Sequence, residues 1–395
     1  MEQADSVVRV LENPAARGRA EAGGFAPADR TPLAFHQRLP GYRPTPLRRL
    51  PALAAALGVG SVWLKDESER FGLPSYKILG ASWATWSAVL GRHPDLPANW
   101  TELDEVRDWL AGKDPLSLVA ATDGNHGRAV ARMARWLGLG ARILVPAGTV
   151  DARIAGIASE GAQVEVVDGS YDDAVVQAAS LAGDDVLVIS DTAWPGYDEI
   201  PRRVIEGYST IFWEIDDALG EVGRAPDVVA VQVGVGALAA AAVRRYRAAA
   251  EPTTALVAVE PASAACAWES VASGHVVDVP GPHTSIMAGL NCGRSSPLAL
   301  PLMQTGIDVF VAVGDELARD AMRRLADEMV VSGESGAAGL AGVEGLLRSD
   351  DGRAALDRLG WDDDTTLLLI NTEGATDPGA YRSIVGRPAE DVRSG

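Results

Sequence analysis

The sequence predicts an α/β protein with two three-layer domains, each built around a twisted and mostly parallel sheet. Short runs rich in β-branched residues alternate along the chain with amphipathic segments, which is typical of parallel sheets covered by helices. The chain has 395 residues, more than one domain usually contains, and 47% of them are apolar, enough for sizeable cores. Alternation, length and apolar content together favour this fold class.

Eight short runs are predicted to be strands. They are residues 61–64, 118–121, 142–145, 163–167, 186–189, 228–231, 256–259 and 367–370. Amphipathic helices are predicted at residues 127–137 and 315–329, and the apolar run 228–243 is predicted to be a buried strand followed by a helix. The ends of the chain, residues 1–30 and 387–395, are predicted to be arms or tails.

The positions of these runs predict a domain inserted into another. The four runs between residues 118 and 189 are expected to form the sheet of a small domain, residues 81–192. The remaining segments, residues 1–80 and 193–395, are expected to form a larger, discontinuous domain.

The charge of the chain excludes polyanionic partners. It contains 35 Lys and Arg against 54 Asp and Glu, a formal charge of −19 that would repel nucleic acid and anionic membranes. Glu2, Asp5 and Arg9 lie where an export signal would be apolar, and the run 228–243 is shorter than the roughly 18 residues of a membrane span. We therefore expect a cytoplasmic protein that binds neither nucleic acid nor membranes.

The two cysteines, Cys266 and Cys292, provide neither a disulfide framework nor a CxxC metal clip. No metal site is predicted. Whether the two thiols form a bridge or stay reduced in a core is left open by the sequence.

Lys77 is the first candidate catalytic residue, in the segment Pro74-Ser75-Tyr76-Lys77-Ile78-Leu79-Gly80-Ala81. Most lysines lie at the surface, but the apolar neighbours of Lys77 would bury its stem. Burial lowers the pKa of an amine toward the neutral form that a Schiff base requires. Lys77 is therefore a candidate to hold an aldehyde cofactor.

The turn Thr122-Asp123-Gly124-Asn125-His126 lies between a predicted strand and a predicted helix. Free N–H groups at a helix start bind anions, so this turn can take a substrate carboxylate. His126 is either a carboxylate contact or a capping residue. A carboxylate such as Asp123 beside a substrate carboxylate is unfavourable, so Asp123 has either a catalytic use or the role of a helix cap.

A second turn that suits an anion is Gln232-Val233-Gly234-Val235-Gly236-Ala237-Leu238-Ala239. Its small residues would let backbone N–H groups approach a phosphate closely at a helix start. Gly234, Gly236 and Ala239 also fit the dinucleotide pattern G-x-G-x-x-A, with Glu260 as its acidic residue. A nicotinamide dehydrogenase would leave Lys77 and the turn around Asn125 unexplained, which favours a phosphate of another cofactor.

These motifs occur in the same order as in a known family. Three further segments agree: Ser190-Asp191-Thr192-Ala193-Trp194-Pro195-Gly196-Tyr197, Ser332-Gly333-Glu334-Ser335-Gly336 and Leu369-Ile370-Asn371-Thr372-Glu373-Gly374. From about residue 44 to 378 the chain resembles the pyridoxal-phosphate (PLP) lyases of the tryptophan-synthase-β fold type, fold type II. Within them it is most similar to the diaminopropionate ammonia-lyases.

The resemblance implies a set of site residues. Catalytic roles fall to Lys77, Asp123 and Asp191; cofactor binding falls to Lys77, Asn125, Gly234, Val235, Gly236, Ala237 and Thr372; substrate binding falls to Thr122, Asp123, Gly124, His126 and Asp191. Asp123 would take the α-proton from one substrate enantiomer and Lys77 from the other. Asp191 would bind the second amino group of the substrate, unless it only caps its turn. Thr372, or else Asn371, would face the pyridine nitrogen, and Glu334 would either border the ring or cap a helix.

The resemblance also implies an activity: PLP-dependent α,β-elimination of D- and L-2,3-diaminopropionate to pyruvate and ammonia, by a homodimeric lyase of amino-acid metabolism. A serine or threonine dehydratase, or a β-replacement enzyme of the same fold, is the alternative. An amino-acid sensor without catalysis would not need the Lys77 motif.

Overall fold

The computed structural model describes residues 7–16, 26–97, 99–122, 124–248 and 253–394. Its residue contacts divide the chain into two compact units. The seven-strand unit contains residues 1–28, 45–69 and 211–395, and the four-strand unit contains residues 29–44 and 70–210. The predicted domain boundaries at residues 81 and 193 stay a prediction. None of the described helices is both long and apolar enough to cross a membrane.

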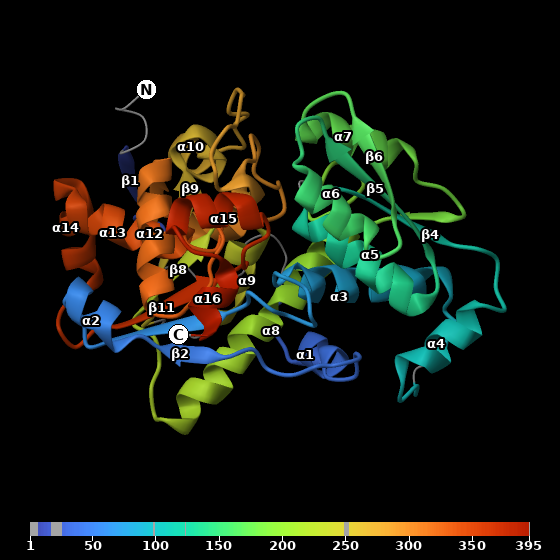
Figure 1. Cartoon of the computed structure of the whole chain (residues 1–395), viewed down its shortest axis with the longest axis horizontal. Helices are drawn as coiled ribbons and strands as arrows, with labels where there is room; N and C mark the ends of the chain where they lie inside the picture. The colour runs from blue at the N-terminus through green and yellow to red at the C-terminus, as the bar shows by residue number, and fades with distance from the viewer. Residues whose placement is uncertain (1–6, 17–25, 98, 123, 249–252, 395) are drawn as a thin grey trace. The chain divides into compact units, whose positions relative to one another are not determined.

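The seven-strand unit is built on a mixed sheet in the order β1-β10-β9-β8-β11-β3-β2 (Figure 1). The five inner strands are parallel, and the edge strands β1 and β2 are antiparallel to their neighbours. The strands are β1 (Val8–Glu12), β2 (Leu47–Arg49), β3 (Ser61–Asp66), β8 (Val228–Gln232), β9 (Ala255–Pro261), β10 (Val309–Val313) and β11 (Thr366–Asn371). Strands β8 to β11 are buried along their whole length, as parallel strands covered on both faces must be.

Helices of this unit complete its core. They are α2 (Pro51–Leu57), α9 (Ala237–Tyr246), α10 (Cys266–Ser273), α11 (Leu300–Gly306), α12 (Asp315–Asp327), α13 (Ala338–Arg348), α14 (Asp350–Leu359), α15 (Pro378–Val385) and α16 (Ala389–Ser394). Helix α13 packs on β8, β9 and β10. Gly342 permits this close packing, since a Cβ there would lie 2.4 Å from Cγ2 of Val259.

The four-strand unit contains an all-parallel sheet in the order β6-β5-β4-β7. The strands are β4 (Ser117–Ala121), β5 (Gly140–Pro146), β6 (Gln163–Val167) and β7 (Val186–Val188). The helices are α1 (Thr31–His36), α3 (Lys77–Arg92), α4 (Leu103–Leu110), α5 (Asn125–Leu137), α6 (Asp151–Ala158) and α7 (Tyr171–Ser180). A cluster of aromatic and aliphatic side chains around Phe35, Trp86 and Trp100 forms one of its cores. Helix α8 (Glu199–Glu221) continues from this unit into the seven-strand unit.

All eight predicted strands occur, and the predicted fold class is confirmed. Two predictions about the chain ends are wrong. Residues 8–12 form β1, because their backbone pairs with β10, about 300 residues later in the sequence. Residues 389–394 form α16, whose Val392 is 1% exposed and belongs to the core of the seven-strand unit, so this segment is not a tail.

Candidate active site

Lys77 is the first residue of α3 and lies in the four-strand unit. Its side chain is 19% exposed, and its Nζ lies 2.9 Å from Oδ2 of Asp191, in a partly buried ion pair. The phenol of Tyr208 on α8 also lies beside the amine, and its ring packs against that of Tyr76. The structure therefore brings together Lys77 and Asp191, which are 114 residues apart in the sequence.

The ion pair determines the charge of both groups. Burial by itself lowers the pKa of Lys77, but the Asp191 carboxylate and the two neighbouring phenols together raise it well above its ordinary value. Burial would raise the pKa of Asp191, yet the charges of Lys77 and His126 lower it to about 2. The sequence argument that burial makes the lysine neutral is therefore wrong for the protein without cofactor, because a carboxylate faces the amine.

Asp191 lies in a turn whose residues contact one another. The Tyr197 hydroxyl donates to the carbonyl of Val188 at 2.6 Å and accepts from the N–H of Ser190 at 3.1 Å. The Trp194 and Tyr197 rings stack with centroids 4.0 Å apart. These contacts fix the backbone on both sides of Asp191 and direct its carboxylate at Lys77.

The predicted anion-binding turn follows β4 and begins α5. The Thr122 hydroxyl oxygen accepts from the N–H groups of Gly124 and Gly127 at 2.9 and 3.1 Å, so Thr122 holds the turn closed. Gly124, with φ +153°, is the residue before the helix, and Asn125 is its first residue. His126 Nε2 donates to the carbonyl of Ile189 at 2.8 Å, which ties α5 to the segment that carries Asp191. Asp123 lies outside the described residues.

The second predicted turn lies in the seven-strand unit, between β8 and α9. Gly236 has φ +101°, and a Cβ there would lie 2.6 Å from Cε of Met303. Among the described residues, the N–H groups of Gly234, Val235 and Gly236 have no acceptor. With Ala237 as the first residue of α9, this turn presents backbone donors and the positive end of a helix to an anion.

Thr372 follows β11, the neighbour of β8 in the sheet, so Thr372 and the Gly234–Gly236 turn lie at the same edge. Its side chain is 4% exposed. The Asn371 amide donates to Asp66 Oδ1 and to the carbonyl of Val331 at 3.0 and 2.9 Å. These bonds occupy both amide protons of Asn371, which favours Thr372 as the group that faces the cofactor nitrogen.

Glu260 takes a structural role, and the two cysteines are not bridged. The Glu260 carboxyl accepts from the N–H groups of Ala267 and Trp268 at 2.8 and 2.7 Å, at the start of α10, so it is not presented to a ribose. Burial raises the pKa of Glu260 to about 8, against the effect of these two bonds. Cys266 and Cys292 are both free thiols in the structure.

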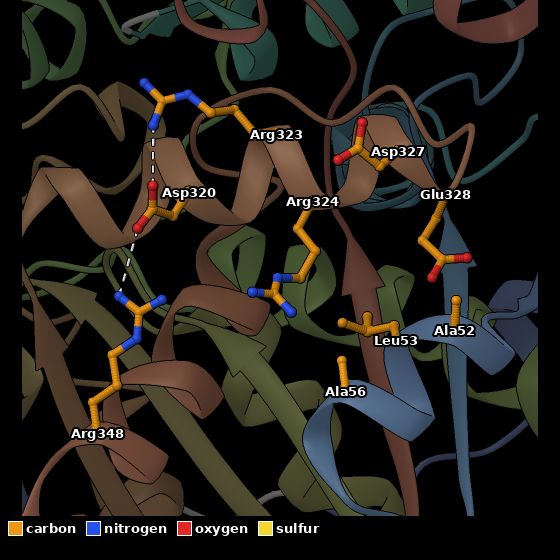
Figure 2. A pocket seen from close by; sticks show the side chains of 9 residues that line it. All are labelled: Ala52, Leu53, Ala56, Asp320, Arg323, Arg324, Asp327, Glu328 and Arg348. Carbon is orange, nitrogen blue, oxygen red and sulfur yellow. Dashed lines mark hydrogen bonds and ion pairs between the residues drawn. The ribbon is translucent and has the colours of Figure 1, made fainter.

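A surface pocket of about 540 Å³ lies elsewhere in the seven-strand unit, among α2, α12 and the end of α13 (Figure 2). Asp320 forms ion pairs with Arg323 and Arg348 at 3.0 and 3.5 Å. None of the predicted site residues lines this pocket. Its charges largely satisfy one another, so it is not the candidate active site.

Sequence reasoning missed Tyr208 and Gln232. Tyr208 lies on the apolar stripe of α8, where helical spacing indicates a core residue but does not indicate which side chain it meets. The sequence marks Gln232 only as part of the glycine-rich motif. The signal that could have identified it is a polar residue at the end of a run of buried apolar residues.

Comparison with known proteins defines the class of enzyme. Residues 38–355 match the family described as pyridoxal-phosphate dependent enzyme. The chain belongs to this family, within fold type II, and its cofactor is PLP.

Diaminopropionate ammonia-lyases are among the most similar relatives. The enzyme of Escherichia coli K12 is 36% identical over 360 residues, which cover 89% of each chain. A crystal structure of the Escherichia coli enzyme in complex with D-serine matches with a TM-score of 0.88 and 32% identity, covering 96% of this chain and 97% of that one. Another, with an aminoacrylate-PLP azomethine reaction intermediate, has a TM-score of 0.86, 32% identity and the same coverage.

The residues present fit PLP. Gly234, Val235 and Gly236 offer backbone N–H groups that have no acceptor in the described part of the chain, at a helix start, as a phosphate requires. Lys77 offers a partly exposed primary amine, as an aldehyde requires. Both groups lie in segments that the sequence predicts to bind this cofactor.

Proposed function

We propose that this protein is a PLP-dependent ammonia-lyase that eliminates the β-amino group from D- and L-2,3-diaminopropionate. The observation that carries the proposal is the Lys77–Asp191 ion pair, 2.9 Å long, in a chain 36% identical to diaminopropionate ammonia-lyases. A carboxylate beside the cofactor lysine suits a substrate with a second ammonium group. The overall reaction converts diaminopropionate and water into pyruvate and two molecules of ammonia.

Each site residue has a proposed role. Bound PLP supplies the electron sink that stabilises negative charge at the α-carbon. Gly234, Val235, Gly236 and Ala237 hold its phosphate, and Asn125 and Thr372 contact its ring. These residues orient the cofactor and perform no proton transfer.

The proton transfers are assigned to side chains with a carboxylate or an amine. Lys77 removes the α-proton from one enantiomer, and Asp123 removes it from the other. Asp191 holds the β-ammonium group of the substrate until it leaves as ammonia. This role agrees with the low pKa of Asp191, which keeps the carboxylate charged at neutral pH.

The substrate carboxylate is assigned to the turn that begins α5. Gly124 supplies backbone, while Thr122 and His126 maintain its shape through the bonds to Gly127 and Ile189. A cytoplasmic homodimer is proposed on the resemblance and on the charge of the chain.

The absorbance spectrum of the purified protein tests this function. We expect a yellow protein whose visible band shifts with either enantiomer of diaminopropionate and which releases pyruvate from both. The Lys77→Ala protein should release none. A yellow protein that ignores diaminopropionate but acts on serine or threonine would support the dehydratase alternative, and a protein that cannot bind PLP would overturn the proposal.

A second variant tests the assignment of the two bases. We expect Asp123→Asn to lose activity on one enantiomer and to keep most of its activity on the other. An equal loss on both enantiomers would contradict the two-base assignment without affecting the cofactor assignment.

A further inference from the structure

Gln232 is the last residue of β8 and lies two residues before Gly234. Its side chain is 3% exposed. Its Nε2 donates to the carbonyl of Ile370 at 2.7 Å and to the carbonyl of Gly336 at 2.8 Å. One buried amide therefore connects three separate segments of the seven-strand unit.

Two of the segments adjoin residues assigned to the cofactor, and the third contains Glu334, which the resemblance places either beside the ring or at a helix start. Gln232 leads into the Gly234–Gly236 turn, Ile370 lies two residues before Thr372, and Gly336 ends the loop that contains Glu334. The sheet pairs β8 with β11 only as far as Ala230 and Leu369, and the loop that ends at Gly336 belongs to neither strand. The carboxamide supplies the link.

The loop from Val331 to Gly336 is buried and is bonded at both ends. Asn371 donates to the carbonyl of Val331 at its beginning, and Gln232 donates to the carbonyl of Gly336 at its end. Between them, the N–H of Gly333 donates to the carbonyl of Glu373, and the N–H of Ser335 donates to Oε1 of Glu373, both at 3.0 Å. A buried loop without strand or helix partners needs such bonds to keep one conformation.

We propose that Gln232 is a positioning residue for the cofactor: its amide sets the spacing of the phosphate-binding turn, the Thr372 strand end and the Glu334 loop before PLP binds. The inference rests on the proposed function for the identity of the ligand. It goes beyond that function because the Gln232 amide donates to two backbone carbonyls and has no part in the proposed proton transfers. A surface that is preformed loses less freedom on binding and therefore binds more tightly.

The chemistry of the amide makes the proposal specific to glutamine. Two carbonyl groups must receive hydrogen bonds from one side chain, which requires an –NH₂ group. Methionine has a similar length and no donor, so Gln232→Met leaves both carbonyls buried without a partner. Gly339→Ala is the matched control, since its Cβ would lie 3.6 Å from Nε2 of Gln232, in ordinary contact, and would leave both bonds intact.

The test titrates PLP into protein from which the cofactor has been removed. For Gln232→Met we expect the Kd of PLP to rise roughly tenfold to a hundredfold, by analogy with residues that orient the ligands of a bound metal. Wild type and Gly339→Ala should bind alike. A merely structural role would lower the unfolding temperature of the variant with and without PLP and leave Kd unchanged, and that result would overturn the proposal.

Hydrogen exchange of the cofactor-free protein provides a readout that needs neither activity nor a folded variant. In the wild type we expect the N–H groups of Gly333 and Ser335 to be protected before PLP is added. Protection that appears only with PLP would overturn the proposal, even if Gln232→Met fails to fold. A wild type that is protected but binds no PLP would contradict the proposed function and leave the positioning role intact.

Discussion

The protonation state of Lys77 is controlled by one residue, Asp191. The carboxylate lies 2.9 Å from the amine, and its charge makes the largest favourable contribution to the raised pKa of Lys77. Since the amine must lose its proton to combine with an aldehyde, Asp191 both holds Lys77 in place and delays its reaction.

We expect Asp191→Asn to have two opposite effects. The pKa of Lys77 should fall, so the cofactor-free variant should combine with PLP at a lower pH than the wild type. The kcat/KM for diaminopropionate should fall by about a hundredfold or more, because the β-ammonium group loses its counter-ion. Stopped-flow absorbance over a pH series and pyruvate release measure the two effects.

Asp184→Asn is the control for this variant. Asp184 has a fully exposed carboxylate, which forms a surface ion pair with Arg92. Asp184→Asn should change neither the pH at which the protein combines with PLP nor the kcat/KM for diaminopropionate. An Asp191→Asn protein with wild-type kcat/KM would remove Asp191 from the proposed mechanism.

Glu260 should make stability depend on pH in an unusual direction. In the unfolded chain its carboxyl loses its proton near pH 4.5, whereas in the folded protein burial raises the pKa to about 8. Between these values the folded state binds the extra proton, so its stability falls as pH rises, by at most about 1.4 kcal/mol per pH unit. Above about pH 8 the loss is complete.

Urea unfolding at several pH values measures this effect. Glu260→Gln carries no titrating group, so the free energy of unfolding of the variant relative to wild type should increase from pH 5 to pH 8. A difference that stays constant over this range would contradict the raised pKa of Glu260.

At the scale of elements, the start of α3 is positioned by its contact with α8. Two glycines make this contact close: a Cβ at Gly80 would lie 2.5 Å from the Tyr208 ring, and a Cβ at Gly207 would lie 2.4 Å from the carbonyl oxygen of Leu79. The backbones of α3 and α8 therefore lie in direct contact at Gly80, three residues after Lys77. This contact places the phenol of Tyr208 beside the amine of Lys77.

We expect Gly207→Ala to separate these helices. The added methyl group would meet backbone, which cannot move aside, so the free energy of unfolding should fall by about 1–3 kcal/mol. PLP binding should weaken too, since Lys77 begins α3. Gly220→Ala, in the same helix, has open space around its Cβ and should instead stabilise the protein by roughly 0.5–1 kcal/mol. Thermal unfolding that ranks the two variants the other way would contradict this packing argument.

A comparison of the strands shows which of them can be recognised from the sequence alone. Strands such as β8 and β11 are continuous apolar runs, and burial on both faces makes them recognisable without any knowledge of their neighbours. β10 (Val309–Val313) is also a continuous apolar run, but it is not among the predicted strands. β1 is different, because four of its five residues are only partly buried, the fifth is exposed, and its pairing with β10 joins distant parts of the chain.

The site residues likewise fall into those that a local motif identifies and those that depend on distant contacts. Lys77, Asn125, Asp191 and the Gly234–Gly236 turn lie in local motifs, so the sequence indicates their chemistry. The roles of Tyr208 and Gln232 depend on contacts with segments more than 100 residues away, which no local pattern contains. The charge of Lys77 was misjudged for the same reason, since its partner Asp191 is distant in the sequence.

At the scale of the whole molecule, the residues predicted to bind PLP are distributed over both compact units. Lys77 and Asn125 belong to the four-strand unit, whereas the Gly234–Gly236 turn and Thr372 belong to the seven-strand unit. Each unit has a sheet and hydrophobic cores of its own.

We expect PLP to couple the unfolding of the two units. A ligand held by groups of both units stabilises the state in which both are folded, by about 2.7 kcal/mol when its free concentration is a hundred times its Kd. Hydrogen exchange measures this separately for the two sheets. Without PLP, the slowest-exchanging N–H groups of β4 (Ser117–Ala121) and β8 (Val228–Gln232) should report different free energies of opening. With PLP, both strands should report the same, higher free energy of opening. Pyridoxal, which lacks the phosphate, should raise β4 more than β8. If PLP protected only one of these strands, the assignment of cofactor-binding residues to the other unit would be wrong.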